Sequence, residues 1–113
     1  MQFNCDARLP SPSTLLVKVG GVLDAGTSIE MEMTLSPHLR NTAVDKVILE
    51  VSDLTFVSSS GLRVMMIIIK TLTPRKGNLY MVGASSQIVG LVKMSGMTKW
   101  IHLRDSLRDC ENA

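Results

Sequence analysis

The sequence predicts an α/β fold in which strands alternate with helices and neighbouring strands run parallel. One observation is the apolar, β-branched segment 47–51, which is typical of a central strand buried on both faces. A second is the longer apolar segment 62–72, which follows three serines and stops before Pro74. The third is the alternation of strand and helix patterns along the chain, because parallel strands need helical crossovers between them.

Two strands are expected near the N-terminus. Residues 3–9 have strand character and end at the turn residues 10–12, which read Pro-Ser-Pro. Residues 15–19, which read Leu-Leu-Val-Lys-Val, are a good second strand, which closes at the glycine pair 20–21. The two segments are close enough in the chain to be neighbours in one sheet.

A helix is expected to begin at Thr27. Its apolar face repeats at spacings of three and four and consists of Ser28, Met31, Leu35 and Leu39. Pro37 interrupts this pattern, because proline has no backbone N–H and its ring crowds the preceding turn. We therefore expect the helix to end near Ser36 or to kink there.

The C-terminal half continues the alternation of elements. Segment 62–72 has no clear period, but its length and the preceding serines favour a helix over a strand. The remaining expected elements are a strand at 78–83, a short helix capped by Ser85 or Ser86 and ended by Gly96, a strand at 100–103 and a last helix at 105–110. Six methionines are interpreted as core residues: Met31, Met33, Met65, Met66, Met94 and Met97. Met94 and Met97 would be exceptions if the turn at residues 95–96 is exposed.

Composition narrows the function classes. A chain of 113 residues with 45% hydrophobic residues is expected to form one domain, residues 1–113, around one core. The net charge is +2 and aromatic residues make up 4%, so we expect no direct nucleic-acid partner. The start of the chain does not resemble a signal peptide, and the longest apolar run, 64–69, is too short to cross a membrane. We therefore expect a cytoplasmic protein without membrane insertion.

The chain offers little for a metal or a cofactor. Cys5 and Cys110 lie at opposite ends without metal-ligand spacing, and we interpret them as reduced thiols. His38 and His102 are isolated in the sequence, so no metal site is expected. The chain has no phosphate-binding Gly-Lys-Ser/Thr loop, and we expect no cofactor.

The serine-rich segment 53–62 carries the strongest functional signal. It lies where a buried strand gives way to a buried helix, and the first turn of a helix leaves backbone N–H groups free to attract anions. A serine at this position either caps the helix or carries a phosphate. Ser59 as the nucleophile of a hydrolase is disfavoured, because Val57 occupies the place of the first glycine of a Gly-x-Ser-x-Gly elbow. We expect the protein not to be an enzyme.

Three motifs in order resemble the STAS domain family, which includes anti-sigma factor antagonists. Residues 21–24 with Thr27 resemble the Gly-x-Leu-Asp…Thr signature, and residues 53–62 resemble the central Asp-Ser-Ser/Thr-Gly-Leu loop. Residues 88–97 resemble the late helix and its Ser-Gly turn. The resemblance covers residues 15–107 and implies a small mixed sheet of about five strands with helices packed mainly on one face.

The resemblance also implies a mechanism. Unphosphorylated antagonists bind an anti-sigma factor with kinase activity and free the sigma factor for transcription. The kinase then phosphorylates a serine that corresponds to Ser59, the pair separates, and a phosphatase resets the switch. The resemblance places partner binding at Asp24, Thr27, Ser58, Ser59, Ser60, Gly61 and Leu62. For Asp24 a second role, as the cap of the first helix, stays open.

One position departs from the family pattern. Ser58 stands where the family has an aspartate immediately before the phosphorylated serine. In one interpretation Ser58 takes the place of that aspartate, and the phosphate goes to Ser59 or alternatively to Ser60. In the other the protein is not phosphorylated and binds its partner constitutively. The alternative function is an unphosphorylated STAS scaffold or a small cytoplasmic subunit of a lipid or anion transport complex. Gly61 is expected to permit close packing of the backbone.

Overall fold

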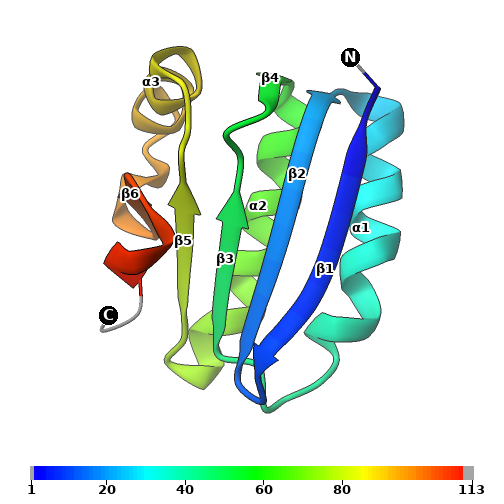
Figure 1. Ribbon diagram of the computed structural model, residues 1–113, viewed down its shortest axis with the longest axis vertical. Helices are drawn as coiled ribbons and strands as arrows, with labels where there is room; N and C mark the ends of the chain where they lie inside the picture. The colour runs from blue at the N-terminus through cyan, green and yellow to red at the C-terminus, as the bar shows by residue number, and fades with distance from the viewer. Residues whose placement is uncertain (1, 111–113) are drawn as a thin grey trace.

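The apolar strands assemble into one mixed sheet in the computed structural model, which describes residues 2–110 (Figure 1). Its elements are β1 (Asn4–Ser11), β2 (Thr14–Leu23), α1 (Ala25–Leu39), β3 (Lys46–Glu50), β4 (Leu54–Val57), α2 (Ser59–Leu72), β5 (Asn78–Val82), α3 (Ser86–Met94) and β6 (Ile101–Arg104). Short 3-10 helices follow at η1 (Thr73–Arg75), η2 (Met97–Lys99) and η3 (Leu107–Cys110).

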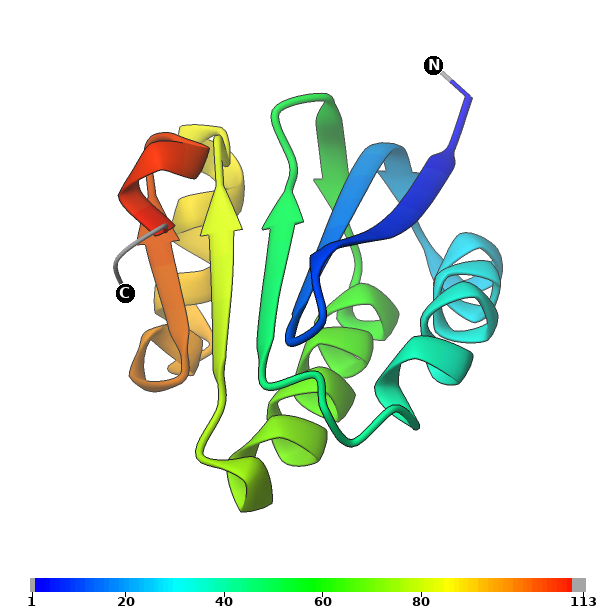
Figure 2. The ribbon, with the colours of Figure 1, turned by 60° about the horizontal axis from the view of Figure 1, so that its bottom comes forward.

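The sheet has the strand order β1-β2-β3-β5-β6, and β4 pairs with the end of β2. β1 and β2 form an antiparallel hairpin, whereas the other pairs are parallel. The fold class expected from the sequence is thereby confirmed, with a small mixed sheet. Figures 1 and 2 show that α1, α2 and α3 lie on one face of this sheet.

The main core fills the space between the sheet and the three helices. The alternation of buried residues along β2 places Leu15, Val17 and Val19 on the helix side, where they are fully buried. A smaller apolar cluster lies apart from this core and contains Ile48, Tyr80, Val82 and Cys110, so η3 covers part of the other face. A helix was expected at 105–110, and the structure has only the four-residue η3 there.

Helix α1 differs from the expected helix at both ends. It begins at Ala25 rather than Thr27, and it continues through Pro37 to Leu39 rather than ending near Ser36. Pro37 lacks an N–H and therefore leaves only the carbonyl oxygen of Met33 without its helical donor, whereas the amide of Arg40 still donates to the carbonyl oxygen of Ser36 at 3.1 Å. The buried face of the helix is the predicted one: Ser28, Met31, Leu35 and Leu39.

Two strands also differ from the expected ones. β4 was not expected, because a four-residue strand beside a polar loop gives no period, and only pairing with β2 reveals it. β1 extends through Pro10, which an edge strand tolerates because its outer side has no ladder to complete.

Met33 and Met94 are 71% and 88% exposed, so the interpretation of Met33 as a core residue was wrong, whereas Met94 is the exception foreseen for an exposed turn. Met31, Met65 and Met97 are buried as expected, and Met97 is therefore not an exception.

Candidate partner-binding site at the N-termini of α1 and α2

The first turns of α1 and α2 lie at the same end of the sheet, where β2 and β4 stop (Figure 1). Leu23 pairs with Val57 as the last residue of each strand. The next residues along the chain, Asp24 and Ser58, are the caps of the two helices. The amide of Ser58 donates to the carbonyl oxygen of Leu23 at 2.9 Å, which ties the two helix starts together.

Asp24 caps α1 through a reciprocal capping box with Thr27. The amide of Thr27 donates to Asp24 Oδ1 at 3.0 Å, and the amide of Asp24 donates to Thr27 Oγ1 at 2.8 Å. The Thr27 hydroxyl also donates to the carbonyl oxygen of Val22 at 2.7 Å. The backbone amide of Thr27 is the main reason that the pKa of Asp24 lies below its ordinary value. The capping role is thus present, and the carboxylate is also exposed on the surface.

Ser58 caps α2 in the same manner. Its Oγ accepts a hydrogen bond from the amide of Gly61 at 3.3 Å, and its backbone is extended, as an N-cap requires. An aspartate at this position would accept the same bond, so Ser58 supplies the geometry that the family's carboxylate would supply. Ser59 follows as the first residue of α2 and is exposed, whereas Ser60 is half-buried.

Gly61 brings the first turn of α2 close to the sheet. A Cβ atom at this position would lie 2.8 Å from Leu23 Cδ2 and 2.9 Å from Val57 Cγ1. Any larger residue therefore pushes α2 away from the ends of β2 and β4. The expected packing role of Gly61 is confirmed, and Leu62 beside it is half-buried. Gly61 is itself buried, so its expected contribution to partner binding acts through the position of the helix.

The start of α2 favours an anion, whereas the start of α1 already carries the Asp24 carboxylate. Neither α1 nor α2 carries an acidic residue in its first turn, and the positive end of the α2 dipole points towards Ser59. Thr55 Oγ1 donates to the carbonyl oxygen of Gly21 at 3.0 Å and holds β4 in place beneath this turn. Within residues 2–110 no group of three metal-ligating side chains occurs.

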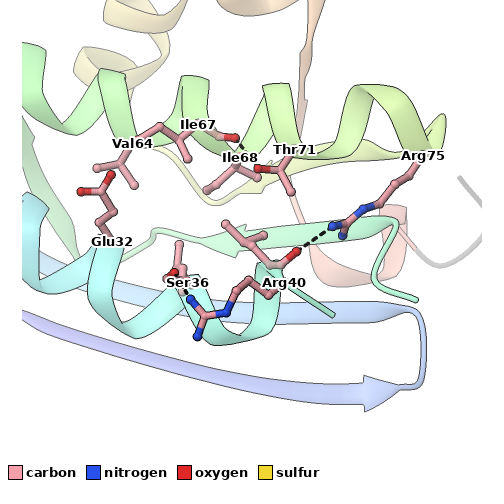
Figure 3. A pocket seen from close by; sticks show the side chains of 10 residues that line it. Glu32, Ser36, Arg40, Val64, Ile67, Ile68, Thr71 and Arg75 are labelled. Atoms are coloured by element: carbon pink, nitrogen blue, oxygen red, sulfur yellow. Dashed lines mark hydrogen bonds between the residues drawn. The ribbon is translucent and has the colours of Figure 1, made fainter. Parts of the chain in front are cut away.

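A groove runs between α1 and α2 on the side away from the sheet (Figure 3). It has a volume of about 460 Å³, with Leu35, Val64 and Ile68 in its lining and Arg75 at one end. The Arg75 guanidinium donates to the carbonyl oxygens of Leu39, Asn41 and Val44 at 2.7–3.1 Å, so it satisfies backbone acceptors at the end of α1.

A smaller hollow of about 200 Å³, here called the notch, lies between the first turns of α1 and α2. Its lining comprises Ala25, Ser28, Ile29, Glu32, Ser60, Arg63 and Val64. Arg63 and Glu32 were not predicted as site residues, and Ser28 was expected only on the buried face of the helix. The one sequence signal was the spacing of Arg63, which stands one helical turn after Ser59.

The described residues contain no helix of the length and hydropathy that a membrane span requires.

Comparison with protein families matches residues 9–110 to the STAS domain. Among curated relatives, the anti-sigma-B factor antagonist of Staphylococcus epidermidis is 32% identical over 89 residues, which cover 79% of this chain and 82% of the relative. The anti-sigma-B factor antagonist of Staphylococcus aureus is 29% identical over the same shares. These relatives are named as regulators and not as enzymes, which supports the expectation that this chain has no catalytic role.

Solved structures show the same fold. Unphosphorylated SpoIIAA, an anti-sigma factor antagonist, aligns with a TM-score of 0.78 and 16% identity over 94% of this chain and 92% of its own. An anti-sigma factor antagonist from Mycobacterium paratuberculosis aligns with a TM-score of 0.82 and 18% identity over 96% of this chain and 90% of its own. SpoIIAA has also been solved in its phosphorylated form, which aligns with a TM-score of 0.78, 17% identity and coverage of 96% of this chain and 98% of its own.

Proposed function

Because the chain belongs to the STAS domain family and has anti-sigma factor antagonists among its relatives, we propose that it binds an anti-sigma factor with serine kinase activity. In this proposal the unphosphorylated protein occupies the kinase and frees a sigma factor. Phosphorylation of Ser59 ends the binding, and a phosphatase restores it. The proposed setting is the cytoplasm, where the kinase, ATP and the transcription machinery meet.

The observation that carries the proposal is the position of Ser59. Its side chain is exposed on the first residue of α2, so a kinase can reach it without unfolding the helix. The cap of the helix is provided by Ser58 through its bond to the Gly61 amide, so Ser59 is not needed for that purpose. The departure from the family pattern at Ser58 therefore leaves the local geometry of the acceptor intact.

The physical effect of phosphorylation follows from this position. A phosphate adds about −1.5 to −2 charges and three acceptor oxygens at the positive end of the α2 dipole, which the domain itself tolerates well. A partner that covers Ser59 must strip water from that dianion and place its own groups against it. This costs several kcal/mol, in order of magnitude, and lowers the affinity strongly.

The surface expected for the partner is formed by both helix starts. Asp24 and Thr27 stand on α1, and residues 58–62 stand on α2, joined through the bond between Ser58 and Leu23. A contact that spans both helices would sense a change at Ser59 without any change of fold. This arrangement supports a switch that acts by charge and contact area.

The test is intact mass after incubation with the cognate anti-sigma factor kinase and ATP. We expect one added phosphate on the wild type and on Ser60→Ala, and none on Ser59→Ala. Ser60→Ala is the matched control, because it removes the neighbouring hydroxyl and leaves Ser59 in place. Phosphate on Ser59→Ala but not on Ser60→Ala would move the acceptor to Ser60.

Binding of the same kinase without nucleotide completes the test. Stable binding with no phosphate on any variant would identify a constitutive antagonist. If the protein neither binds the kinase nor gains a phosphate, the result would favour the alternative function, a scaffold or a subunit of a transport complex.

A further inference from the structure

The notch between the first turns of α1 and α2 contains a polar group that the fold leaves unsatisfied. Ser28 lines the notch and is only 3% exposed. Its hydroxyl oxygen has no hydrogen-bond partner within residues 2–110. Buried side-chain oxygens are normally paired, and an unpaired one costs folding free energy, so this serine calls for an explanation.

The position of the notch connects it to the proposed partner surface. Ser60, which belongs to that surface, forms part of the notch wall, and Ala25 follows the Asp24 cap directly. Glu32 and Val64 line both the notch and the larger groove, and Figure 3 shows Glu32 extending from α1 towards Val64 on α2. A partner that covers Ser59 would therefore lie over the mouth of the notch.

The lining of the notch has a defined chemistry. Glu32 offers acceptors, Arg63 offers donors, and the hydroxyls of Ser28 and Ser60 can do either. The two charged residues cancel, so the notch presents hydrogen-bonding groups of both kinds with no net charge. A carboxylate would meet Glu32 and an ammonium group would meet Arg63, and both pairs repel. A neutral group that both donates and accepts has no such conflict.

We propose that the notch is the anchor site for a side-chain amide, an Asn or Gln of the anti-sigma factor. This inference rests on the proposed function. The amide has one carbonyl acceptor and an NH₂ with two donors, which match Arg63 on one side and Glu32 on the other. The Ser28 oxygen is closed to solvent in the free protein, so its hydroxyl must turn about its one side-chain torsion to reach the amide, a change of small conformational cost.

Ser28→Ala is the most informative variant. It removes a buried hydroxyl that has no partner in the free protein, so thermal stability should stay equal or rise. The affinity for the purified anti-sigma factor should fall roughly 5- to 30-fold, the range of one lost hydrogen bond in a closed site. Ser36→Ala is the matched control, because Ser36 lies two turns along α1, where it accepts from Arg40 outside the notch. It should leave the affinity unchanged.

Two charge variants identify the group that enters the notch. For an amide anchor, Glu32→Gln and Arg63→Gln should both weaken binding of the anti-sigma factor, because each removes the strength of one charge-assisted bond. Tighter binding of Glu32→Gln would indicate a carboxylate anchor, and tighter binding of Arg63→Gln would indicate a cationic one. Either of these two results overturns the assignment of an amide.

The outcomes separate the inference from the proposed function. If the wild type binds the anti-sigma factor and Ser28→Ala binds equally well, the proposed function stands and the notch is not an anchor site. If the wild type does not bind the anti-sigma factor at all, both fail. Titration calorimetry of the variants, with circular dichroism melts in parallel, gives both readouts.

Discussion

The backbone amide of Ser58 donates a hydrogen bond to the carbonyl oxygen of Leu23, with a nitrogen-to-oxygen distance of 2.9 Å. Leu23 is the last residue of β2, and Ser58 is the cap of α2. The bond therefore fixes the start of α2 relative to the start of α1. The proposed partner surface consists of the N-termini of these two helices, so this bond holds its two halves next to each other.

The cap at Ser58 should contribute to stability. Ser58→Ala leaves the Gly61 amide without its acceptor and should lower the free energy of unfolding by about 1 kcal/mol. Ser58→Asp keeps an acceptor and adds a favourable charge at the helix start, so it should be at least as stable as the wild type. Urea unfolding followed by circular dichroism measures both values.

Ser85→Ala is the matched control for this prediction. Ser85 caps α3 through a bond of the same length, 3.3 Å to the amide of Ile88, away from the proposed partner surface. It should cost a similar free energy of unfolding without changing the rate at which Ser59 is phosphorylated. An unchanged free energy of unfolding for Ser58→Ala, beside a loss for Ser85→Ala, would contradict the prediction.

Substitution of two glycines by alanine should change the stability of the protein in opposite directions. Gly61→Ala places a methyl group against Leu23 and Val57 and should destabilise the protein by about 1–3 kcal/mol. Gly90 lies within α3, and a Cβ added there would have no neighbour outside its own helix within 4 Å. Gly90→Ala should therefore stabilise the protein by up to about 1 kcal/mol. Thermal melts of the two variants compare them. A stabilised Gly61→Ala would contradict the close packing of α2 on β2 and β4.

Asp24 should make the stability depend on pH in the acid range. The amide of Thr27 holds the pKa of Asp24 below the ordinary value of 3.8, so the folded state favours the carboxylate. This contribution is fully present above pH 3.8 and is lost as the pH falls through the lower folded pKa. Asp24→Asn keeps an acceptor for the cap and cannot titrate.

The measurement for Asp24 is the difference in unfolding free energy between wild type and Asp24→Asn. We expect this difference to be constant from pH 7 to about pH 5 and to shrink below that, as the carboxylate is protonated. A difference that stays constant down to pH 2 would show that the charge of Asp24 does not act on the α1 cap.

Cys5 should react slowly with thiol reagents in the native protein. Burial, followed by the charges of Asp6 and Glu30, raises the pKa of Cys5 from 9.0 to about 11. At pH 8 the thiolate fraction should therefore be about 100-fold lower than in the unfolded chain. Iodoacetamide labelling followed by intact mass tests this, and the same reaction in urea is the control.

The same shift has a consequence for stability at high pH. Because the folded state favours the neutral thiol, the contribution of Cys5 is fully present below pH 9 and is lost as the pH rises through about 11. Cys5→Ala should lack this part of the alkaline loss of stability. Cys110, the last residue of η3, is buried and its pKa is also raised by burial, so we expect it to resist labelling as well.

Much of the fold was predictable because its signals are local. The buried face of α1 follows from residues three and four apart, and the caps at Ser58 and Ser85 involve amides only three residues away. The apolar segment 47–51 likewise identified β3 from its own composition. Such features depend on neighbours in the chain, so a reading of the sequence finds them.

The tertiary structure decided what depends on contacts between distant segments. β4 exists because it pairs with β2, and Met33 is exposed because its side of α1 faces away from the sheet. The notch arises only when the starts of α1 and α2 are brought together, which places Ser28 near Ser60 and Arg63. The sequence by itself determined the elements other than β4 and the 3-10 helices, and it placed a serine on the first turn of α2. Only the packing of these elements determined the shared surface and its unsatisfied hydroxyl, because both depend on the distance between two helices.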